Sequence, residues 1–278
     1  MLFVGLTGGI GSGKSEVSKR LAQAGFKILD ADEVSRSLTA ESGEAVPQIT
    51  ELFPDVVENG IIDRAKLADV VFSDPEKLEQ LNGIIHPRVR DRMAEQLRAY
   101  VDEDPRAIVV EDSPLLIETG RAYVHQFLVL ITTPDDTKIE RLVRDRGMTA
   151  EQARARINTQ LTDEERVPFA DVVIDNHKEM EWLDHQVVHL IDRIRKFEDN
   201  VVTGTVPEPR NRSLMNAERL KGKLAHTGTT AVQDGMDLIV PPETSEMVLR
   251  HVCCVPYGDM WVRPDQDAWV RVRLEKIH

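Results

Sequence analysis

The feature that most constrains this chain is a glycine-rich octapeptide between an apolar run and a helical pattern. Residues 8–15 read Gly-Gly-Ile-Gly-Ser-Gly-Lys-Ser and match the pattern GxxxxGK[ST] at every position. Glycines let the backbone turn tightly and aim N–H groups at an anion, and the helix that follows adds the positive end of its dipole. The segment therefore predicts a phosphate-binding loop (P-loop) that joins a buried strand to a helix.

A P-loop of this type predicts a nucleoside triphosphate as ligand. The Lys14 side chain is long enough for its ammonium group to reach the β- and γ-phosphates, and the Ser15 hydroxyl can act as a ligand for Mg²⁺. We therefore expect ATP and Mg²⁺ as cofactors. The residues predicted to contact the nucleotide from this segment are Gly9, Gly11, Ser12, Gly13, Lys14, Ser15 and Glu16.

Alternation of apolar runs with helical patterns predicts an α/β fold. The runs are short and almost continuously apolar, which is typical of strands buried on both faces of a parallel sheet. Helix signals lie between them, including caps at Asp63 and Asp135, a stop at Gly147 and a Thr149–Gln152 capping box. We expect a three-layer α/β/α domain over residues 1–202. The predicted strands are 3–6, 27–29, 107–110, 127–132 and 172–174.

Residues 53–100 contain no convincing strand pattern and predict a helical insertion. Such an insertion serves either as a lid or acceptor-holding subdomain, or as a purely structural helical pair. His86 precedes Pro87, and the residue before a proline avoids the α region, so the pair predicts a helix boundary.

Carboxylates follow two of the predicted strands. Asp32 comes just after the second strand, at the edge of the sheet where ligands bind, and is a candidate general base. The alternative is that Asp30 or Asp32 caps the next helix. Glu111 and Asp112 end the third strand, where a carboxylate helps to hold hydrated Mg²⁺, and spacing does not choose between them.

A basic helix follows the fourth strand in an otherwise acidic chain. Arg141 and Arg144 are three residues apart and share one face of this helix. If the bound nucleotide gives up a phosphoryl group, positive charge over that group would stabilise the transition state, and this helix is a candidate source of it. The alternative is a solvated face paired with neighbouring acids.

Composition narrows the class of protein further. The 278 residues carry 35 basic and 48 acidic side chains, a formal charge of −13, and only 5 % of them are aromatic. This balance argues against nucleic acid or an anionic membrane as a partner. The chain has only two cysteines, which are adjacent, and no apolar run of about 18 residues. The N-terminal sequence lacks a basic segment, and we expect a cytoplasmic protein.

The C-terminal quarter has a different character. Residues 203–212 contain two prolines and a glycine among polar neighbours and predict a linker. Residues 213–278 form a tail that is short for an independent core, so we expect a degenerate appendage that docks on the main domain, with Trp261 and Trp269 as candidate contacts.

Four segments together resemble the dephospho-coenzyme A kinase family, over residues 2–200. They are residues 6–15, Asp30-Ala-Asp32, Leu81-Asn-Gly-Ile-Ile-His86-Pro87 and Asp112-Ser-Pro-Leu-Leu-Ile-Glu118. The resemblance implies transfer of the ATP γ-phosphoryl to the ribose 3′-hydroxyl of dephospho-CoA, the last step of coenzyme A synthesis. The tail weakly resembles the GrpB family, through residues 225–232 and Asp237, which would be one metal carboxylate.

The resemblance also implies residue roles. Asp32 is the implied base, and Arg141 is the implied ATP contact, in a lid over residues 141–160. Together with the P-loop chemistry above, we expect Lys14 to act with these two residues in catalysis and Ser15 with Asp112 to form the metal site. By position alone, Asn176 borders the adenine pocket. The residues expected to bind the acceptor are Asp32, Arg36, His86, Pro87, Leu115, Leu116 and Glu118.

Two other functions stay open at this point. One is a P-loop kinase for another small alcohol or nucleotide, and the other is an ATP-binding regulatory switch. We expect a monomer or a weak homo-oligomer.

Overall fold

The computed structural model describes residues 1–58, 60–72, 74–210 and 213–275. Contacts within it divide the chain into two units, Met1–Ile28 with Arg106–His278, and Leu29–Pro105. The first unit holds the P-loop and the C-terminal appendage, and the second is the helical insertion. In the described part of the chain, no helix is both long and apolar enough to cross a membrane.

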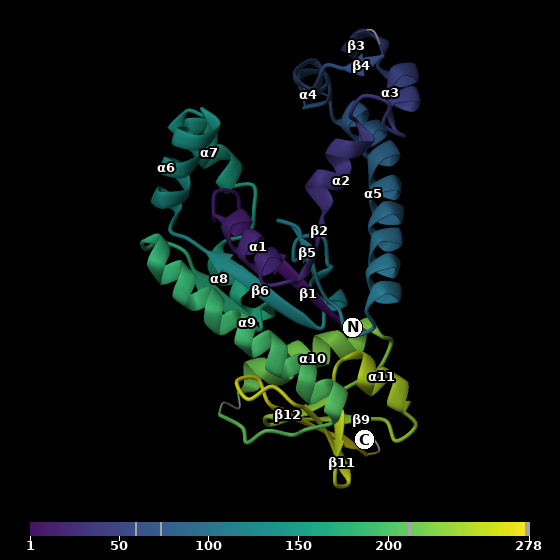
Figure 1. The fold of residues 1–278 in the computed structure, drawn as a ribbon, viewed down its shortest axis with the longest axis vertical. Helices are drawn as coiled ribbons and strands as arrows, with labels where there is room; N and C mark the ends of the chain where they lie inside the picture. The colour runs from purple at the N-terminus through teal and green to yellow at the C-terminus, as the bar shows by residue number, and fades with distance from the viewer. Residues whose placement is uncertain (59, 73, 211–212, 276–278) are drawn as a thin grey trace. The chain divides into compact units, whose positions relative to one another are not determined.

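A five-stranded sheet organises the first unit, in the order β2-β5-β1-β6-β7 (Figure 1). β1 pairs in parallel with β5 and β6, and β6 pairs in parallel with β7. The sheet confirms the predicted α/β class and its five strands. Their bounds are Leu2–Thr7 (β1), Lys27–Asp30 (β2), Ile108–Asp112 (β5), Phe127–Thr132 (β6) and Val172–Asp175 (β7).

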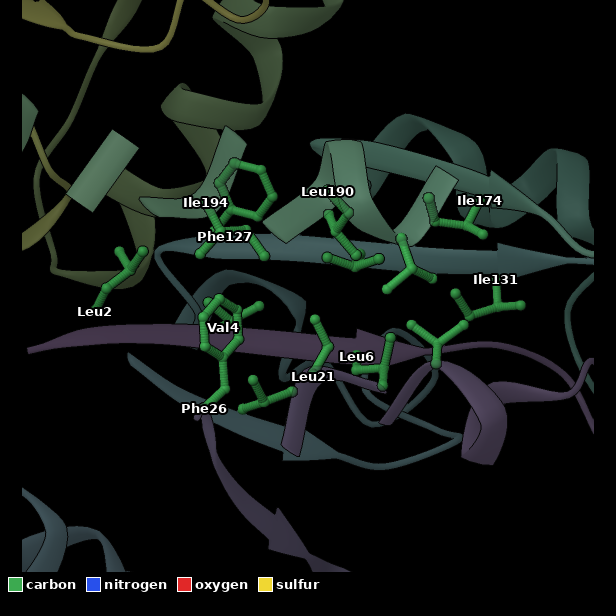
Figure 2. Close-up of a cluster of buried hydrophobic side chains, with 14 of the residues drawn as sticks. Leu2, Val4, Leu6, Leu21, Phe26, Phe127, Ile131, Ile174, Leu190 and Ile194 are labelled. Atoms are coloured by element: carbon green, nitrogen blue, oxygen red, sulfur yellow. The ribbon is translucent and has the colours of Figure 1, made fainter. Parts of the chain in front are cut away.

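Two helices cover one face of this sheet, α1 (Lys14–Gln23) and α9 (Met180–Thr203). Figure 2 shows side chains of β1 and β6 pointing toward those of the two helices, among them Leu21 of α1 and Leu190 of α9. Burial on this scale explains why β1 is apolar throughout, since all six of its residues are buried. The core fixes the carboxyl end of β1, from which the P-loop emerges.

The remaining helices of the domain lie between β5 and β7 in the chain. The predicted capping box of α7 is present, because Thr149 and Gln152 bond to each other's backbone N–H. Gly147 ends α6 in the left-handed region, at φ 63°. The bounds are Ala122–Val124 (η2), Asp135–Arg146 (α6), Ala150–Ile157 (α7), Asp163–Arg166 (α8) and Val167–Phe169 (η3).

The second unit is mostly helical, with two corrections to the prediction. A two-stranded antiparallel ladder, β3 with β4, lies where no strand was expected; strands of two residues are too short to show alternation. The elements are Ala31–Leu38 (α2), Val46–Leu52 (α3), Pro54–Val56 (η1), Val57–Glu58 (β3), Ile61–Ile62 (β4), Arg64–Phe72 (α4) and Pro75–Glu103 (α5).

The predicted helix boundary at His86-Pro87 is wrong, because α5 runs through Pro87. A proline inside a helix removes one backbone hydrogen bond and crowds the carbonyl four residues earlier. Here that residue is Gly83, which has no side chain, and the Arg88 guanidinium donates to the Ile84 carbonyl in the same turn at 2.8 Å. Burial of Ile84, Ile85 and Met93 keeps the helix continuous across this position.

The C-terminal appendage has a sheet and a core of its own. Its strands lie in the order β10-β11-β12-β9-β8, and a buried apolar cluster joins them to α10. Trp269 packs against Val255, Val262 and Val206. The bounds are Leu214–His226 (α10), Val232–Asp234 (β8), Asp237–Val240 (β9), Glu246–His251 (α11), Val255–Tyr257 (β10), Met260–Arg263 (β11) and Val270–Leu274 (β12).

The appendage docks through buried charges. Lys223 and Arg263 both reach Asp171, a residue just before β7, at 2.9 and 3.3 Å, and both donate to the Gln126 carbonyl. Asp171 also accepts from the Leu128 N–H at 2.8 Å. The part of the predicted linker at 203–210 includes the end of α9 and the Arg210 N–H that donates to the Gln266 carbonyl; residues 211–212 lie outside the described residues.

Candidate functional site

The P-loop turns where its glycines allow it. Gly11 and Gly13 have φ values of 78° and 81°, a region in which other residues are strained. A Cβ on Gly13 would lie 2.2 Å from the Asn176 amide, so a larger residue is excluded there. Gly13 is also the N-cap of α1, and no side chain caps that helix. The uncapped N–H groups at its start suit an anionic phosphate.

Side chains brace the P-loop from the side of β7 and α6. The Asn176 amide donates to the Ser12 carbonyl at 2.8 Å, and Thr133 Oγ donates to the same carbonyl at 3.1 Å. Arg141 donates to the carbonyls of Ser12 and Asn176 at 3.3 and 2.8 Å. Burial and, to a lesser degree, the charge of Arg144 lower the pKa of Arg141, and a neighbouring anion would offset both effects. Two residues predicted to contact nucleotide thus also hold the loop's shape.

The structure decides which carboxylate of β5 faces the P-loop. Asp112 forms an ion pair with Lys14, the P-loop lysine. The register places Leu6 opposite Asp112 and Gly5 opposite Glu111, so the two acids point to opposite faces of the sheet. Asp112 is therefore the acid that lies beside the loop, and its role as a metal ligand stays a prediction.

Glu111 is engaged on the other face. It accepts from His125 at 3.0 Å and from Arg121 at 2.8 Å, and His125 is fully buried. Burial alone would raise the pKa of Glu111, but the hydrogen bond and charge of His125, helped by Arg121, lower it overall. We interpret this group as part of the folded framework.

Further polar residues near the P-loop were not among the predicted site residues, although one of them, Lys138, belongs to the predicted basic helix. Lys138 is 4 % exposed and contacts Asp135 and Asp163 at 3.0 and 3.1 Å. Gln160 accepts from the Ile10 N–H of the P-loop at 2.9 Å. Asp163 and Arg166 lie in α8, which begins with a Thr162–Glu165 capping box. That box was a readable signal for the helix, but nothing in the sequence places Gln160 on the loop.

A cavity of about 770 Å³ opens beside the P-loop, within the usual size range of small-ligand pockets. Its walls come from the P-loop, the loop after β6 and the α7–α8 segment. The lining residues include Gly9, Ile10, Thr133, Lys138, Gln160 and Arg166. The cavity places several donor groups next to the loop that is expected to hold phosphate.

Within the second unit, Asp32 and His86 line one cavity of about 470 Å³. Asp30 is the residue that caps α2, accepting from the Glu33 N–H at 2.9 Å. The capping alternative therefore belongs to Asp30, and the Asp32 side chain is left for the cavity. Arg36 and Pro87 belong to the same helices but do not appear among the lining residues.

The segment after β5 places its three predicted acceptor residues differently. Leu115 is 38 % exposed, whereas Leu116 is buried in a cluster with Ile117, Ala122 and Leu128. Glu118 forms an ion pair with the buried Arg166. Leu115 is thus exposed, Glu118 is held by Arg166, and Leu116 is a packing residue in this structure.

The remaining predicted positions have local partners. Glu16 pairs with Arg20 on α1 at 2.8 Å. Asp237, the metal candidate of the appendage, pairs with Arg271 on the neighbouring strand at 2.7 Å. Among the described residues, no cluster of three or more His, Cys, Asp or Glu side chains could hold a metal. Ser15 and Asp112 fit a cation whose other ligands are phosphate and water, which is the usual mode for Mg²⁺.

Comparison with known proteins places the chain among kinases of one kind. The model of the dephospho-CoA kinase family matches residues 2–181. The dephospho-CoA kinase of Thermobifida fusca is 42 % identical over 198 residues, which cover 70 % of this chain and 98 % of that protein. The Streptomyces avermitilis enzyme is 43 % identical over 189 residues, covering 67 % and 91 %.

Solved structures agree with this relationship. The Thermus thermophilus protein TT1252 superposes with a TM-score of 0.60 at 32 % identity, over 69 % of this chain and 96 % of that one. Dephospho-CoA kinase from Campylobacter jejuni gives a TM-score of 0.55 at 26 % identity, over 70 % and 97 %. The extent of the family match, together with the P-loop and the sheet that carries it, shows that the chain belongs to the dephospho-CoA kinase family.

Proposed function

We propose that this chain transfers the γ-phosphoryl group of ATP to the ribose 3′-hydroxyl of dephospho-CoA, giving CoA and ADP. The observation that carries the proposal is the family match over residues 2–181, which contains the P-loop with Lys14 against Asp112. The cavity shared by Asp32 and His86 in the insertion supports an acceptor site there. We also propose that the enzyme works in the cytoplasm, as a monomer or weak homo-oligomer.

In this proposal, the first unit holds the nucleotide. The amides of residues 11–15 cradle the phosphates, and Lys14 exchanges Asp112 for the β- and γ-phosphate oxygens when ATP binds. Ser15 and Asp112 would hold Mg²⁺, which neutralises charge on the β- and γ-phosphates when bound. Arg141, already fixed on the loop carbonyls at 3.3 and 2.8 Å, orients the loop and stabilises negative charge.

The second unit holds the acceptor. Asp32 accepts the proton of the 3′-hydroxyl as that oxygen attacks the γ-phosphorus, the bond to the bridging oxygen of ATP breaks, and ADP leaves. His86 lies on the wall of the same cavity and contacts the acceptor. Asp32→Asn should lower kcat by roughly 10²–10⁴-fold with the Kd of ATP retained. Near-normal turnover would remove Asp32 from the mechanism.

The proposal is tested by a coupled ADP-release assay of the full chain with a panel of acceptors. Dephospho-CoA should give the highest kcat/KM, above adenosine, AMP, shikimate and gluconate. A higher kcat/KM for another alcohol would show that this alcohol, and not dephospho-CoA, is the substrate. Slow ATP turnover that no acceptor accelerates would instead support the regulatory switch.

A further inference from the structure

The side chain that stands out beyond the proposed mechanism is Arg166. It is 1 % exposed, and its guanidinium is held by two carboxylates. Nε and Nη2 both donate to the same oxygen of Glu118, the former at 3.2 Å, and Nη1 donates to Asp163 at 3.4 Å. A buried guanidinium with this fork of partners fixes the orientation of both acids.

Arg166 also touches the P-loop. A Cβ built on Gly9 would lie 2.8 Å from Nη1 of Arg166 and 3.3 Å from Oε1 of Gln160. The guanidinium therefore packs directly against the backbone of the loop's first half. One side chain thus joins three parts of the nucleotide-binding unit, namely the P-loop, the segment after β5 and α8.

Glu118 is left with one oxygen for a ligand. Arg166 takes Oε1, whereas Oε2 is buried and has no hydrogen-bond partner within the described part of the chain. Buried polar atoms normally have partners, and an exception calls for one that arrives from outside the chain. A hydroxyl of the acceptor, or a water bound with it, would supply the missing donor.

We infer that Arg166 is a positioning residue for phosphoryl transfer, which fixes Glu118 so that its free oxygen receives the acceptor. The inference rests on the proposed function and on the expectation, from the family resemblance, that Glu118 binds the acceptor. The positive charge of Arg166 is already balanced by Glu118 and Asp163. It therefore acts through Glu118, and the charge that faces the phosphates comes from Lys14.

The test is steady-state kinetics of the full chain with ATP and dephospho-CoA. Arg166→Met should lower kcat/KM for dephospho-CoA about 100-fold, because the Glu118 carboxylate is then no longer held in place and the acceptor loses its alignment. The KM for ATP should change by no more than about twofold. Arg166→Lys, which keeps one charged donor to Glu118, should recover most of the loss.

A double-mutant cycle identifies the route of the effect. Glu118→Gln alone should lower kcat/KM for dephospho-CoA, and adding Arg166→Met should lower it little further. If the fold-losses of the two single variants multiply in the double variant, Arg166 acts independently of Glu118, and the inference is overturned. A Glu118→Gln variant with wild-type kinetics would overturn it as well.

Two further variants serve as a control and as an alternative test. Arg106 forms a similar fork with Glu198, at 3.0 and 2.6 Å, and Arg106→Met should leave the kinetics unchanged. If Arg166→Met does not fold, Glu118→Asp keeps all the charges but withdraws the carboxylate, and should raise the KM for dephospho-CoA about tenfold. Wild-type KM in that variant would overturn the inference. Failure of the proposed function would give a different result, because the wild-type chain itself would then not phosphorylate dephospho-CoA.

Discussion

Two lysine–aspartate pairs in the same unit show how one chemical contact serves two purposes. Lys14 and Asp112 meet at the P-loop, with side chains 15 % and 5 % exposed, whereas Lys223 and Asp171 meet under the appendage at 3 % and 2 %. The second pair has fixed extra partners, a main-chain carbonyl for Lys223 and Arg263 with a main-chain N–H for Asp171.

This difference separates a contact that can be exchanged from one that is permanent. A lysine that is to reach phosphate must be able to leave its carboxylate, and the partial solvent exposure of Lys14 makes that exchange easier. Lys223 is enclosed, and removing one member of a sealed pair leaves the other as an uncompensated buried charge. We expect the first pair to control turnover and the second to control stability.

The largest effect should follow from Lys14→Met. Turnover should fall by at least about 10³-fold, because the contact with the β- and γ-phosphates is lost and Lys138, the lysine that lines the cavity beside the P-loop, is already paired with Asp135 and Asp163. The melting temperature should change little, since the side chain is near the surface of the loop. Steady-state kinetics and thermal melts of the same sample would check both parts. A folded variant with substantial activity would show that the Lys14–Asp112 pair does not control turnover.

Lys223→Met should show the reverse pattern. Unfolding should become easier by about 3 kcal/mol, which is roughly 10 °C in melting temperature for a chain of this size. KM and kcat of the folded fraction should stay at wild-type values, because Lys223 is bonded to Gln126 and Asp171 and not to the P-loop. Denaturant melts with parallel kinetics are the measurement. Unchanged stability would mean that the appendage is held by its other contacts.

Asp112→Asn sharpens the functional half of the comparison. The amide keeps the shape of the side chain but loses the charge that favours a divalent cation. We expect the Mg²⁺ concentration for half-maximal activity to rise by roughly tenfold. Glu111→Gln is the matched control on the opposite face of β5, and its Mg²⁺ dependence should equal that of the wild type. Equal shifts in both variants would argue against Asp112 as the metal-side acid.

The smallest expected effect is on how the stability of the protein depends on pH under acidic conditions. Burial alone would raise the pKa of Asp171, but the charges of Lys223 and Arg263 hold it below the usual 3.8. The unfolded chain therefore binds this proton before the native chain does, so the free energy of unfolding falls as the pH falls below about 4. Asp171→Asn should reduce that slope by at most about 1.4 kcal/mol per pH unit. Melting temperatures between pH 6 and pH 3 would show it, and an unchanged slope would contradict the assignment.

Residues whose backbone conformation or chain position dictates their role were readable from the sequence. Gly11 and Gly13 are needed where φ is positive, and the apolar run of β1 marks the strand that leads into the loop. Asp32 could be placed at a strand end but not separated from a capping role. The structure assigned the cap to Asp30.

Contacts between distant segments could not be read in this way. Glu118 and Arg166 are 48 positions apart, and Asp171 and Arg263 are 92 apart. Their pairing depends on how the sheet brings the segments together, for which a single sequence holds no periodic signal. The helix through Pro87 is a related case, because burial along α5 overrides a local preference.

The most direct test of the central claim is the identity of the product. The full chain incubated with ATP, Mg²⁺ and dephospho-CoA should form a compound that matches CoA in mass and in the ³¹P NMR signal of a 3′-phosphomonoester. One ADP should appear for each molecule of CoA formed. Release of ADP with inorganic phosphate and no phosphorylated acceptor, or a phosphate at another position of the ribose, would contradict the account.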